Sequence, residues 1–364
     1  MGILETRRNR LIEAMHAQDI DLLLLHGSAW RGDYLRYATD FGILEGEALA
    51  LVGRDGEITL YVDDPGEAER ATVECPDVRC IAVDNLVEDV AEVIRRHGNR
   101  RVGAGPSAHL PYGLTRQAAE LRLVDATALL DRLLIIKAED ELDAVRQAAR
   151  LGDEGYEVFR RAAVEGREDY ALIAEIEAFF RAKGVDDNFM IIGVGGPEVR
   201  GMAPPSGKKL KRGDLVTTEL TPCFGGYYVQ ICRTLVVGEP SVAQLEAFDI
   251  YKQAMEAGIA AVRPGATAAD IARAENDVFR KHGLGEYVTS EYTRVRGHGI
   301  GLFLDTRPQI LEDVDMPVEE GMALIVHPNT YHPVVGYMVL GDSLIVQQDG
   351  AEVLTRTERR LFAQ

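Results

Sequence analysis

The residues that could do chemistry in this chain begin with a carboxylate and an amide placed inside apolar strand sequence. The segment 213–238 holds two β-rich runs, Leu215–Leu220 and Tyr227–Val237, on either side of a Pro/Gly-containing turn, which predicts a hairpin. Glu219 and Gln230 lie near the middle of these runs. A carboxylate in a core strand costs free energy unless it is paired or used. Both residues are therefore candidate site residues; the alternative is that they are satisfied structural groups.

Two histidines follow in the last third of the chain. His298 stands between glycines in the sequence Gly297-His298-Gly299-Ile300-Gly301, so its neighbours give the imidazole little cover. His327 ends the apolar run 321–326. Imidazoles and carboxylates that face one cleft can transfer protons near neutral pH. These residue types predict general acid–base catalysis by His298, Glu219 and His327.

Composition restricts the partners. The chain has 364 residues, 46% of them hydrophobic, which is enough for large cores. Its net charge of −19 argues against binding to a nucleic-acid backbone, and no apolar run approaches the length of a membrane span. The start lacks the apolar core of a signal peptide, and the four cysteines form no CxxC pair. We expect a small-molecule substrate, no nucleic-acid or membrane partner, reduced thiols and a cytoplasmic location.

The first third of the chain alternates helix and strand patterns. This alternation predicts a small α/β domain over residues 1–130, and no glycine-rich phosphate loop opens any of its helices. The pattern predicts helices over Glu5–Gln18, Pro65–Thr72, Leu86–His97 and Pro111–Leu121, and strands over Leu22–Leu25, Glu47–Val52, Glu57–Val62, Val78–Ala82, Val102–Ala104 and Arg122–Asp125. Residues 126–137 are expected to join this domain to the rest.

The remainder of the chain repeats itself. The pattern Ile173-Ala174-x-x-Glu177 returns as Ile271-Ala272-x-x-Glu275, and each copy follows a predicted long helix, Ala138–Ala163 or Val242–Val262. Strand-rich sequence follows each copy. Two copies of helix, helix and strands predict a duplicated α+β unit with an internal pseudo-twofold, and a site between the halves.

The hairpin frame resembles the creatinase/aminopeptidase (M24) family, which has the pita-bread fold. The resemblance rests on Gly213-Asp214-Leu215-Val216, Gly226-Tyr227, Arg233-Thr234 and the Gly297–Gly301 motif. The family includes methionine aminopeptidase, prolidase, aminopeptidase P and creatinase, which is not a peptidase. The resemblance implies a creatinase-type N-terminal α/β domain over residues 1–130 and an α+β pita-bread catalytic domain over residues 131–364.

The resemblance also implies that the usual metal ligands are lost. The peptidases carry aspartates at the positions of Glu219 and Gln230, a histidine at His298, and glutamates at His327 and Gly341. A two-metal hydrolase needs about five hard ligands, with carboxylates that bridge the ions. One carboxylate, one amide and two imidazoles do not form such a cage. A single ion held by Glu219, His298 and His327 remains an alternative.

Further positions are expected to contact the substrate. Met202 and Asp305 each stand where the family has a histidine, and Gly226-Tyr227-Tyr228 is similar to creatinase. Arg294, Arg296 and Arg307 flank the histidine motif and could bind a carboxylate, or could be surface charges. The expected substrate-binding residues are Gln230, Met202, Tyr227, Tyr228, Asp305, Arg307, Trp30 and Arg31. The last two belong to the loop Trp30–Arg36, which in a creatinase-like homodimer would reach the partner's site, or is an ordinary surface loop.

From these residues we predict a metal-independent hydrolase of a C–N bond in a small polar or zwitterionic compound. It would resemble creatinase or ectoine hydrolase, would need no cofactor, and would use His298 as acid and base. One alternative is a single-metal (Fe, Zn or Mn) hydrolase, lyase or Xaa-Pro peptidase-like enzyme. Another is a catalytically inactive pita-bread binding protein, although polar and titratable replacements at the ligand positions argue against it.

Overall fold

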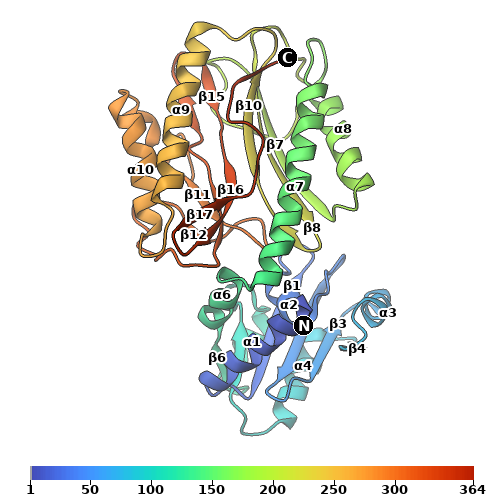
Figure 1. Ribbon diagram of the computed structural model, residues 1–364. Helices are drawn as coiled ribbons and strands as arrows, with labels where there is room; N and C mark the ends of the chain where they lie inside the picture. Colours follow the sequence, from blue (N-terminus) through green and yellow to red (C-terminus); the bar gives the residue numbers. More distant parts are fainter. Residues whose placement is uncertain (1) are drawn as a thin grey trace. The chain divides into compact units, whose positions relative to one another are not determined.

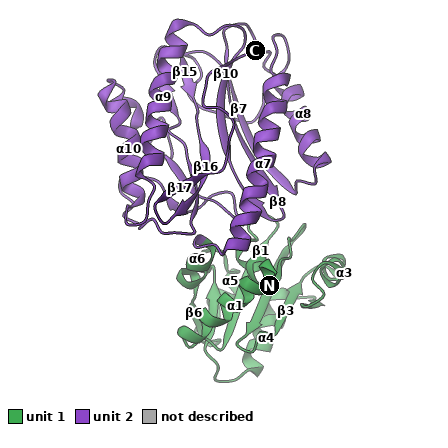
Figure 2. Ribbon diagram, viewed as in Figure 1, with its two compact units in different colours: residues 1–134 green, residues 135–364 purple. Residues whose placement is uncertain are grey.

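The computed structural model describes residues 2–364 and divides the chain into two compact units, residues 1–134 and 135–364 (Figure 2). The sequence placed this division after residue 130. The segment expected to join the two domains forms a helix, α6 (Thr127–Ile135).

Unit 1 is a six-stranded mixed sheet with the strand order β4-β3-β2-β1-β5-β6. The central strand β1 pairs antiparallel with β2 and parallel with β5, and both faces carry helices (Figure 1). The helices are α1 (Ile3–Ala17), α2 (Asp33–Thr39), α3 (Pro65–Glu74), α4 (Leu86–Arg96), α5 (Tyr112–Arg116) and α6, with the 3-10 turn η1 (Ser107–His109). The strands are β1 (Leu22–Ser28), β2 (Glu47–Gly53), β3 (Ile58–Val62), β4 (Arg79–Ala82), β5 (Val102–Gly105) and β6 (Leu123–Asp125).

Two predictions for unit 1 were wrong. The helix expected over Pro111–Leu121 is the five-residue α5, and residues 117–121 form turns although their helix propensity is high. The segment expected to be a loop from Trp30 contains α2, a short helix that buries six of its seven residues. Packing against the sheet stabilises α2, and such packing cannot be seen in seven residues of sequence.

Unit 2 contains four long helices and two five-stranded sheets (Figure 1). Its helices are α7 (Glu139–Ala162), α8 (Asp169–Ala182), α9 (Val242–Ala261) and α10 (Ala268–Lys281), with the 3-10 turn η2 (Gly285–Val288). Its strands are β7 (Asp187–Gly195), β8 (Leu215–Phe224), β9 (Tyr227–Tyr228), β10 (Ile231–Val236), β11 (Gly297–Gly299), β12 (Thr306–Gln309), β13 (Ala323–Val326), β14 (Thr330–His332), β15 (Gly336–Met338), β16 (Asp342–Gln347), β17 (Gly350–Val353) and β18 (Phe362–Ala363).

The predicted duplication is confirmed. The first half of unit 2 comprises α7, α8 and β7–β10, and the second half comprises α9, α10 and β11–β17. The sheet orders are β18-β10-β8-β7, with β9 beside β8, and β12-β11-β13-β16-β17. The helices of each half lie over an apolar core, and the core under α9 and α10 also takes in Leu215 of β8 and Val236 of β10. The long helices α7 and α9 lie within one residue of their predicted bounds.

The hairpin that carries Glu219 is longer than predicted. Strand β8 continues to Phe224, and the turn is Gly225-Gly226, where φ is 57° and 83°. Positive φ at both central residues is the geometry of a tight hairpin turn, which glycine adopts without strain. The register places Cys232 of β10 opposite Glu219 of β8, so the two side chains lie on one face of the sheet.

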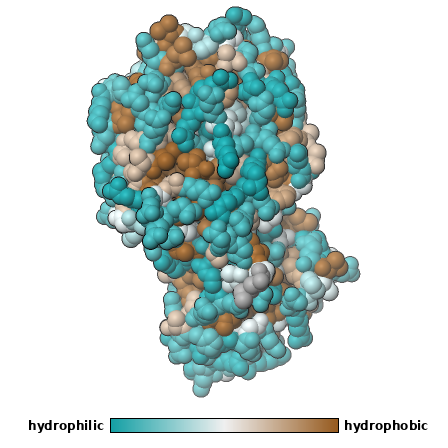
Figure 3. Space-filling model, viewed as in Figure 1, coloured by the Kyte–Doolittle hydropathy of each residue, from teal (hydrophilic) through white to brown (hydrophobic). Residues whose placement is uncertain are grey.

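Among residues 2–364, no helix combines the length and apolar character needed to cross a bilayer. Hydrophilic residues cover most of the face drawn in Figure 3, in keeping with the net charge of −19. Apolar side chains gather in a recess on the same face of unit 2 (Figure 3).

Candidate functional site

Glu219 is the carboxylate at the centre of the site. It lies in β8, keeps some solvent exposure, and accepts a hydrogen bond from Nδ2 of Asn329 at 3.0 Å. Its surroundings raise the pKa of Glu219 to about 7, because burial disfavours the charged carboxylate more than the hydrogen bonds from Asn329 and Cys232 favour it. A carboxyl group with this pKa can accept and donate a proton at neutral pH.

The second half of unit 2 contributes the two imidazoles. His298 lies in β11 and His327 follows β13, and their ring centroids are 5.6 Å apart. Nδ1 of His298 lies 2.9 Å from the Gly299 carbonyl oxygen, which only accepts, so this nitrogen carries the proton and Nε2 keeps its lone pair. Burial lowers the pKa of His298, and burial together with the charge of His298 lowers the pKa of His327 to about 3. Both rings are therefore neutral at neutral pH.

Asp305 and Arg294 give the carboxylate and the imidazoles a common electrostatic environment. Oδ1 of Asp305 lies 3.9 Å from Nδ1 of His298, and Arg294 pairs with the other carboxylate oxygen. The charge of Asp305 acts on the pKa of His298 and of Glu219 alike. Asp305 was expected to bind substrate; a salt bridge with Arg294 and a hydrogen bond from Gln309 already occupy its oxygens.

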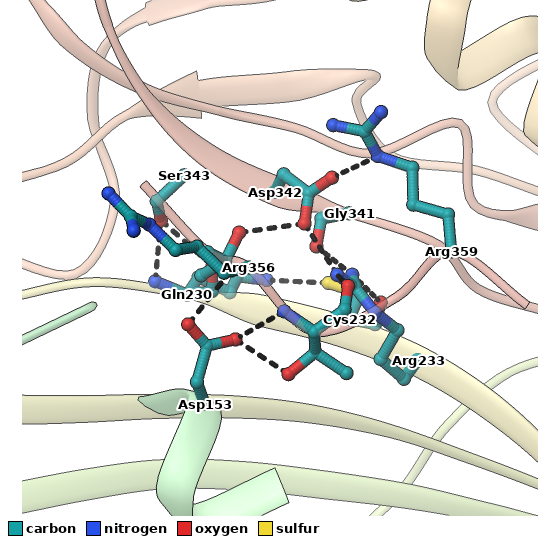
Figure 4. A network of polar contacts seen from close by, with 11 residues as sticks. Asp153, Gln230, Cys232, Arg233, Gly341, Asp342, Ser343, Arg356 and Arg359 are labelled. Atoms are coloured by element: carbon teal, nitrogen blue, oxygen red, sulfur yellow. Dashed lines mark hydrogen bonds and ion pairs between the residues drawn. The ribbon is translucent and has the colours of Figure 1, made fainter. Parts of the chain in front are cut away.

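Gln230 lies between β9 and β10, two residues before Cys232. Its backbone exchanges two hydrogen bonds with the hydroxyl of Ser343, and its Nε2 donates to Sγ of Cys232 at 3.5 Å. Figure 4 shows Cys232 beside Gly341, where the family resemblance implies a glutamate ligand in the peptidases. Burial first, and then the charge of Glu219, raise the pKa of the Cys232 thiol well above its usual value, so the sulfur keeps its proton.

Besides Cys232, which lies opposite Glu219 in the sheet, sequence reasoning missed Asn329 and Tyr337 as neighbours of Glu219. Asn329 supplies its hydrogen bond, and Tyr337 lies close enough that burial and the charge of Glu219 raise the pKa of its phenol. Asn329 follows His327 by two residues at the end of a buried strand, which is a position where polar residues often have a function. Tyr337 belongs to the β14–β15 pair, and no local pattern connects it to β8.

For Arg296 the sequence left two alternatives open, a substrate-binding group or a surface charge, and the structure shows neither. Its side chain is 2% exposed, and its guanidinium donates to Oδ1 of Asn276 at 2.5 Å and to the Asn329 carbonyl oxygen at 2.9 Å. The backbone carbonyl of Arg296 accepts from the amide of His327 at 2.9 Å. Arg296 therefore supports the segment 327–329 from behind.

The remaining predicted residues of unit 2 have different surroundings. Tyr227 is buried, and its hydroxyl donates to Glu141 of α7 at 2.9 Å, which is a structural role. Tyr228 is partly exposed; its hydroxyl donates to Asp187, and its amide donates to Gly301 of the other half. Met202 is partly buried in the loop between β7 and β8. Arg307, in β12, is exposed.

The two predicted residues of unit 1 are Trp30 and Arg31. Trp30 is 80% exposed, the same degree as Val73, and these are the highest values among the large hydrophobic residues that the structure describes. Nε of Arg31 pairs with Oδ1 of Asp33 at 2.7 Å. Trp30 thus offers an exposed aromatic surface, and Arg31 is held at the start of α2.

The donor groups at the five expected ligand positions cannot hold a pair of divalent ions. Glu219 is the only carboxylate among the five expected ligand positions, and its Oε1 is already hydrogen-bonded to Asn329. Within the described range 2–364, no group of three or more His, Cys, Asp or Glu side chains is arranged to hold a metal ion. Two cations brought together need several carboxylates to bridge them and offset their charges, and Glu219 alone is too few.

Comparison with known proteins gives the same fold. Residues 143–348 match the model of metallopeptidase family M24, and residues 7–136 match the creatinase/prolidase N-terminal domain. A Xaa-Pro dipeptidase of Pyrococcus horikoshii is 26% identical over the full length of both chains. The solved prolidase from Pyrococcus furiosus superposes with a TM-score of 0.80 at 25% identity, covering 95% of this chain and 99% of its own. The X-Pro aminopeptidase structure from Thermotoga maritima has a TM-score of 0.89 at 20% identity, covering 98% and 99%, which shows the fold alone.

Proposed function

This chain belongs to metallopeptidase family M24, a family of hydrolases, and on that premise we propose that it hydrolyses a C–N bond of a small polar substrate by general acid–base catalysis. The proposed proton-transfer groups are Glu219 and His298. The creatinase-type N-terminal domain and the pita-bread catalytic domain agree with the prediction from sequence.

The observation that carries the proposal is the state of Glu219. Its pKa is about 7, and Asn329 holds the carboxyl group by one oxygen. With this pKa, the carboxyl group of Glu219 exists in both its ionised and its protonated form at neutral pH. The ionised form can take a proton from water, and the protonated form can return one to the leaving nitrogen.

His298 would work beside Glu219 as a neutral base. Its Nδ1 proton is held by the Gly299 carbonyl, so the ring orientation is fixed and Nε2 can accept a proton. His327 is also neutral and suits hydrogen bonding to a substrate carbonyl or anion. General acid–base assistance of this kind contributes about 10²–10⁴-fold to a rate.

The comparisons favour a peptide substrate over the compounds predicted from sequence. The similar proteins are named as Xaa-Pro dipeptidases, and not as creatinase or ectoine hydrolase. A peptide bond is a C–N bond, so Xaa-Pro dipeptides are the first substrates to examine, and small amides, ureas and cyclic amidines are the second. We place the reaction in the cytoplasm, in agreement with the four free cysteines.

A second candidate is a single-metal, prolidase-like dipeptidase, which the family relationship supports. Glu219, His298 and His327 would be its ligands. The three side chains would have to converge from their present positions, since no described group of three is arranged to hold an ion. A metal chelator should abolish the activity of a single-metal enzyme, whereas it should not change the rate of metal-free acid–base catalysis.

The deciding experiment measures turnover and metal content on the same preparation. We expect hydrolysis of at least one C–N substrate from this panel, unchanged after EDTA treatment, with far less than one equivalent of Fe, Zn or Mn. Stoichiometric metal with chelator-sensitive activity would establish the second candidate. No turnover of any substrate, with or without added Mn²⁺, would instead support the inactive binding protein.

A further inference from the structure

Gly341 occupies a position where no side chain fits. A Cβ atom added there would lie 2.8 Å from Cβ of His327 and 3.0 Å from Sγ of Cys232. The first distance is shorter than side chains tolerate, and the second is at the limit. The glycine is therefore required by its two neighbours. Gly341, His327 and Cys232 therefore share one packed space, in which a side chain at 341 would overlap the other two.

Cys232 is tied to Gly341 and faces Glu219. The two backbones exchange hydrogen bonds of 3.1 and 2.9 Å, which join β10 of the first half to the second half (Figure 4). The register places Cys232 opposite Glu219, and its thiol is among the hydrogen-bond partners of that carboxylate. The Gln230 amide donates to the sulfur from the other side.

The thiol is not placed to attack a substrate. Its residue is 0% exposed, and Glu219, Gln230 and Gly341 surround it. A nucleophile must reach the substrate, whereas this sulfur reaches protein groups only. Its geometry suits a donor that holds the carboxylate in place.

We propose that Cys232 is a positioning residue of the site, which holds Glu219 through its thiol and occupies space that a side chain at 341 would need. Gly341 and His327 leave room for it. The part concerning Glu219 rests on the proposed function, and the part concerning shared space does not.

The shared space is tested by a double-mutant cycle on stability. Gly341→Ala should lower the free energy of unfolding, because the new methyl group overlaps Cys232 and His327. In Cys232→Ala the sulfur is gone, so adding Gly341→Ala should cost less than it does in the wild type. Gly201→Ala is the matched control, because a Cβ at Gly201 meets no atom within 4 Å. Strict additivity of the two changes would overturn the shared-space part of the proposal.

The positioning role is tested by separating kcat from KM. Cys232→Ala should lower kcat about 10-fold, the scale of one hydrogen bond to a charged group, with KM unchanged. Cys232→Ser keeps a donor and should recover most of the loss, while Cys223→Ala, at a buried thiol in the same sheet, should leave kcat unchanged. Equal kcat in Cys232→Ala and wild type would overturn the positioning role. If the wild type hydrolyses no substrate, the proposed function fails, and the stability cycle still decides the shared-space part.

Discussion

The two halves of unit 2 carry a glutamate at the same place in their second helix, and the two carboxyl groups have opposite surroundings. Glu177 of α8 is partly exposed and accepts a hydrogen bond from Asn188 at 2.6 Å. Glu275 of α10 is 0% exposed, and neither of its oxygens has a hydrogen-bond partner among the described residues. Burial raises the pKa of Glu275 well above its usual value, against the opposing effect of Arg296.

The difference between the glutamates shows how the halves have specialised. In the first half, α8 covers a regular sheet, and the long pairing of β7, β8 and β10 is enough to place Glu219. In the second half the imidazoles lie on or beside short strands, and α10 brings Glu275, Asn276 and Phe279 toward the buried Arg296, which fixes the segment 327–329. To position its site residues, the second half thus relies on the buried Arg296, whereas the first relies on strand pairing.

The largest expected effect concerns the contribution of each half to chemistry. Glu219→Gln removes the proton acceptor of the first half, and His298→Ala removes that of the second. Each should lower turnover about 10²–10⁴-fold without changing the melting temperature by much. Steady-state kinetics with a thermal melt on each variant measures both.

Arg161→Gln, at an exposed position of α7 outside the site, is the control and should keep both its fold and its turnover. Near-wild-type turnover in both site variants would remove the catalytic role from both halves.

The next effect concerns the ion pair that joins the halves. Arg233 of β10 and Asp342 of β16 are both 0% exposed and are paired at 2.7 Å (Figure 4). Arg233→Met leaves Asp342 with one guanidinium fewer in a buried place, which should cost about 3–5 kcal/mol in the free energy of unfolding. Denaturant unfolding measures this loss. Arg273→Met breaks a half-exposed pair with Asp270 within α10 and should cost far less, so equal losses would refute the inference that buried charge joins the halves.

Sequence reasoning succeeded where the signal was local or repeated. The paired motifs ending in Glu177 and Glu275 revealed the duplication, and the glycine-flanked His298 revealed one catalytic candidate. It could not place Asn329, Cys232 or Arg296, because their roles depend on contacts across twenty or more residues or between the halves. The burial of an arginine two residues before the predicted histidine is likewise a tertiary property that sequence spacing does not encode.

A smaller expected effect tests whether the site needs a residue of unit 1 in addition to the two halves of unit 2. We propose a homodimer in which the segment Trp30–Arg36 of one subunit, which includes the start of α2, borders the site of its partner. The 80% exposure of Trp30 leaves that ring able to bury apolar surface there. Trp30→Ala should lower kcat/KM about 10-fold, in line with the loss of one buried aromatic contact, without lowering the melting temperature. Tyr112→Ala, at a ring that is 79% exposed in the same unit, should have no effect. Sedimentation analysis that finds a monomer at assay concentration would refute this arrangement.

The smallest expected effect concerns Glu275 and Glu177. It is a change in how the free energy of unfolding depends on pH. In the folded state Glu275 keeps its proton to a higher pH than it does in the unfolded chain. Glutamates in an unfolded chain have a pKa of about 4.3. As pH rises above that value the unfolded state gives up this proton first, so Glu275 lowers stability progressively until its folded-state pKa is passed. The amide introduced by Glu275→Gln does not titrate. The free energy of unfolding of this variant, measured relative to wild type, should therefore rise between pH 4 and pH 8. Urea unfolding at several pH values measures the slope, and Glu177→Gln, at the repeat-matched position, is the control. Parallel stability curves for Glu275→Gln and wild type would mean that the buried carboxyl is already ionised beside Arg296, and the contrast between the halves would then be one of packing alone.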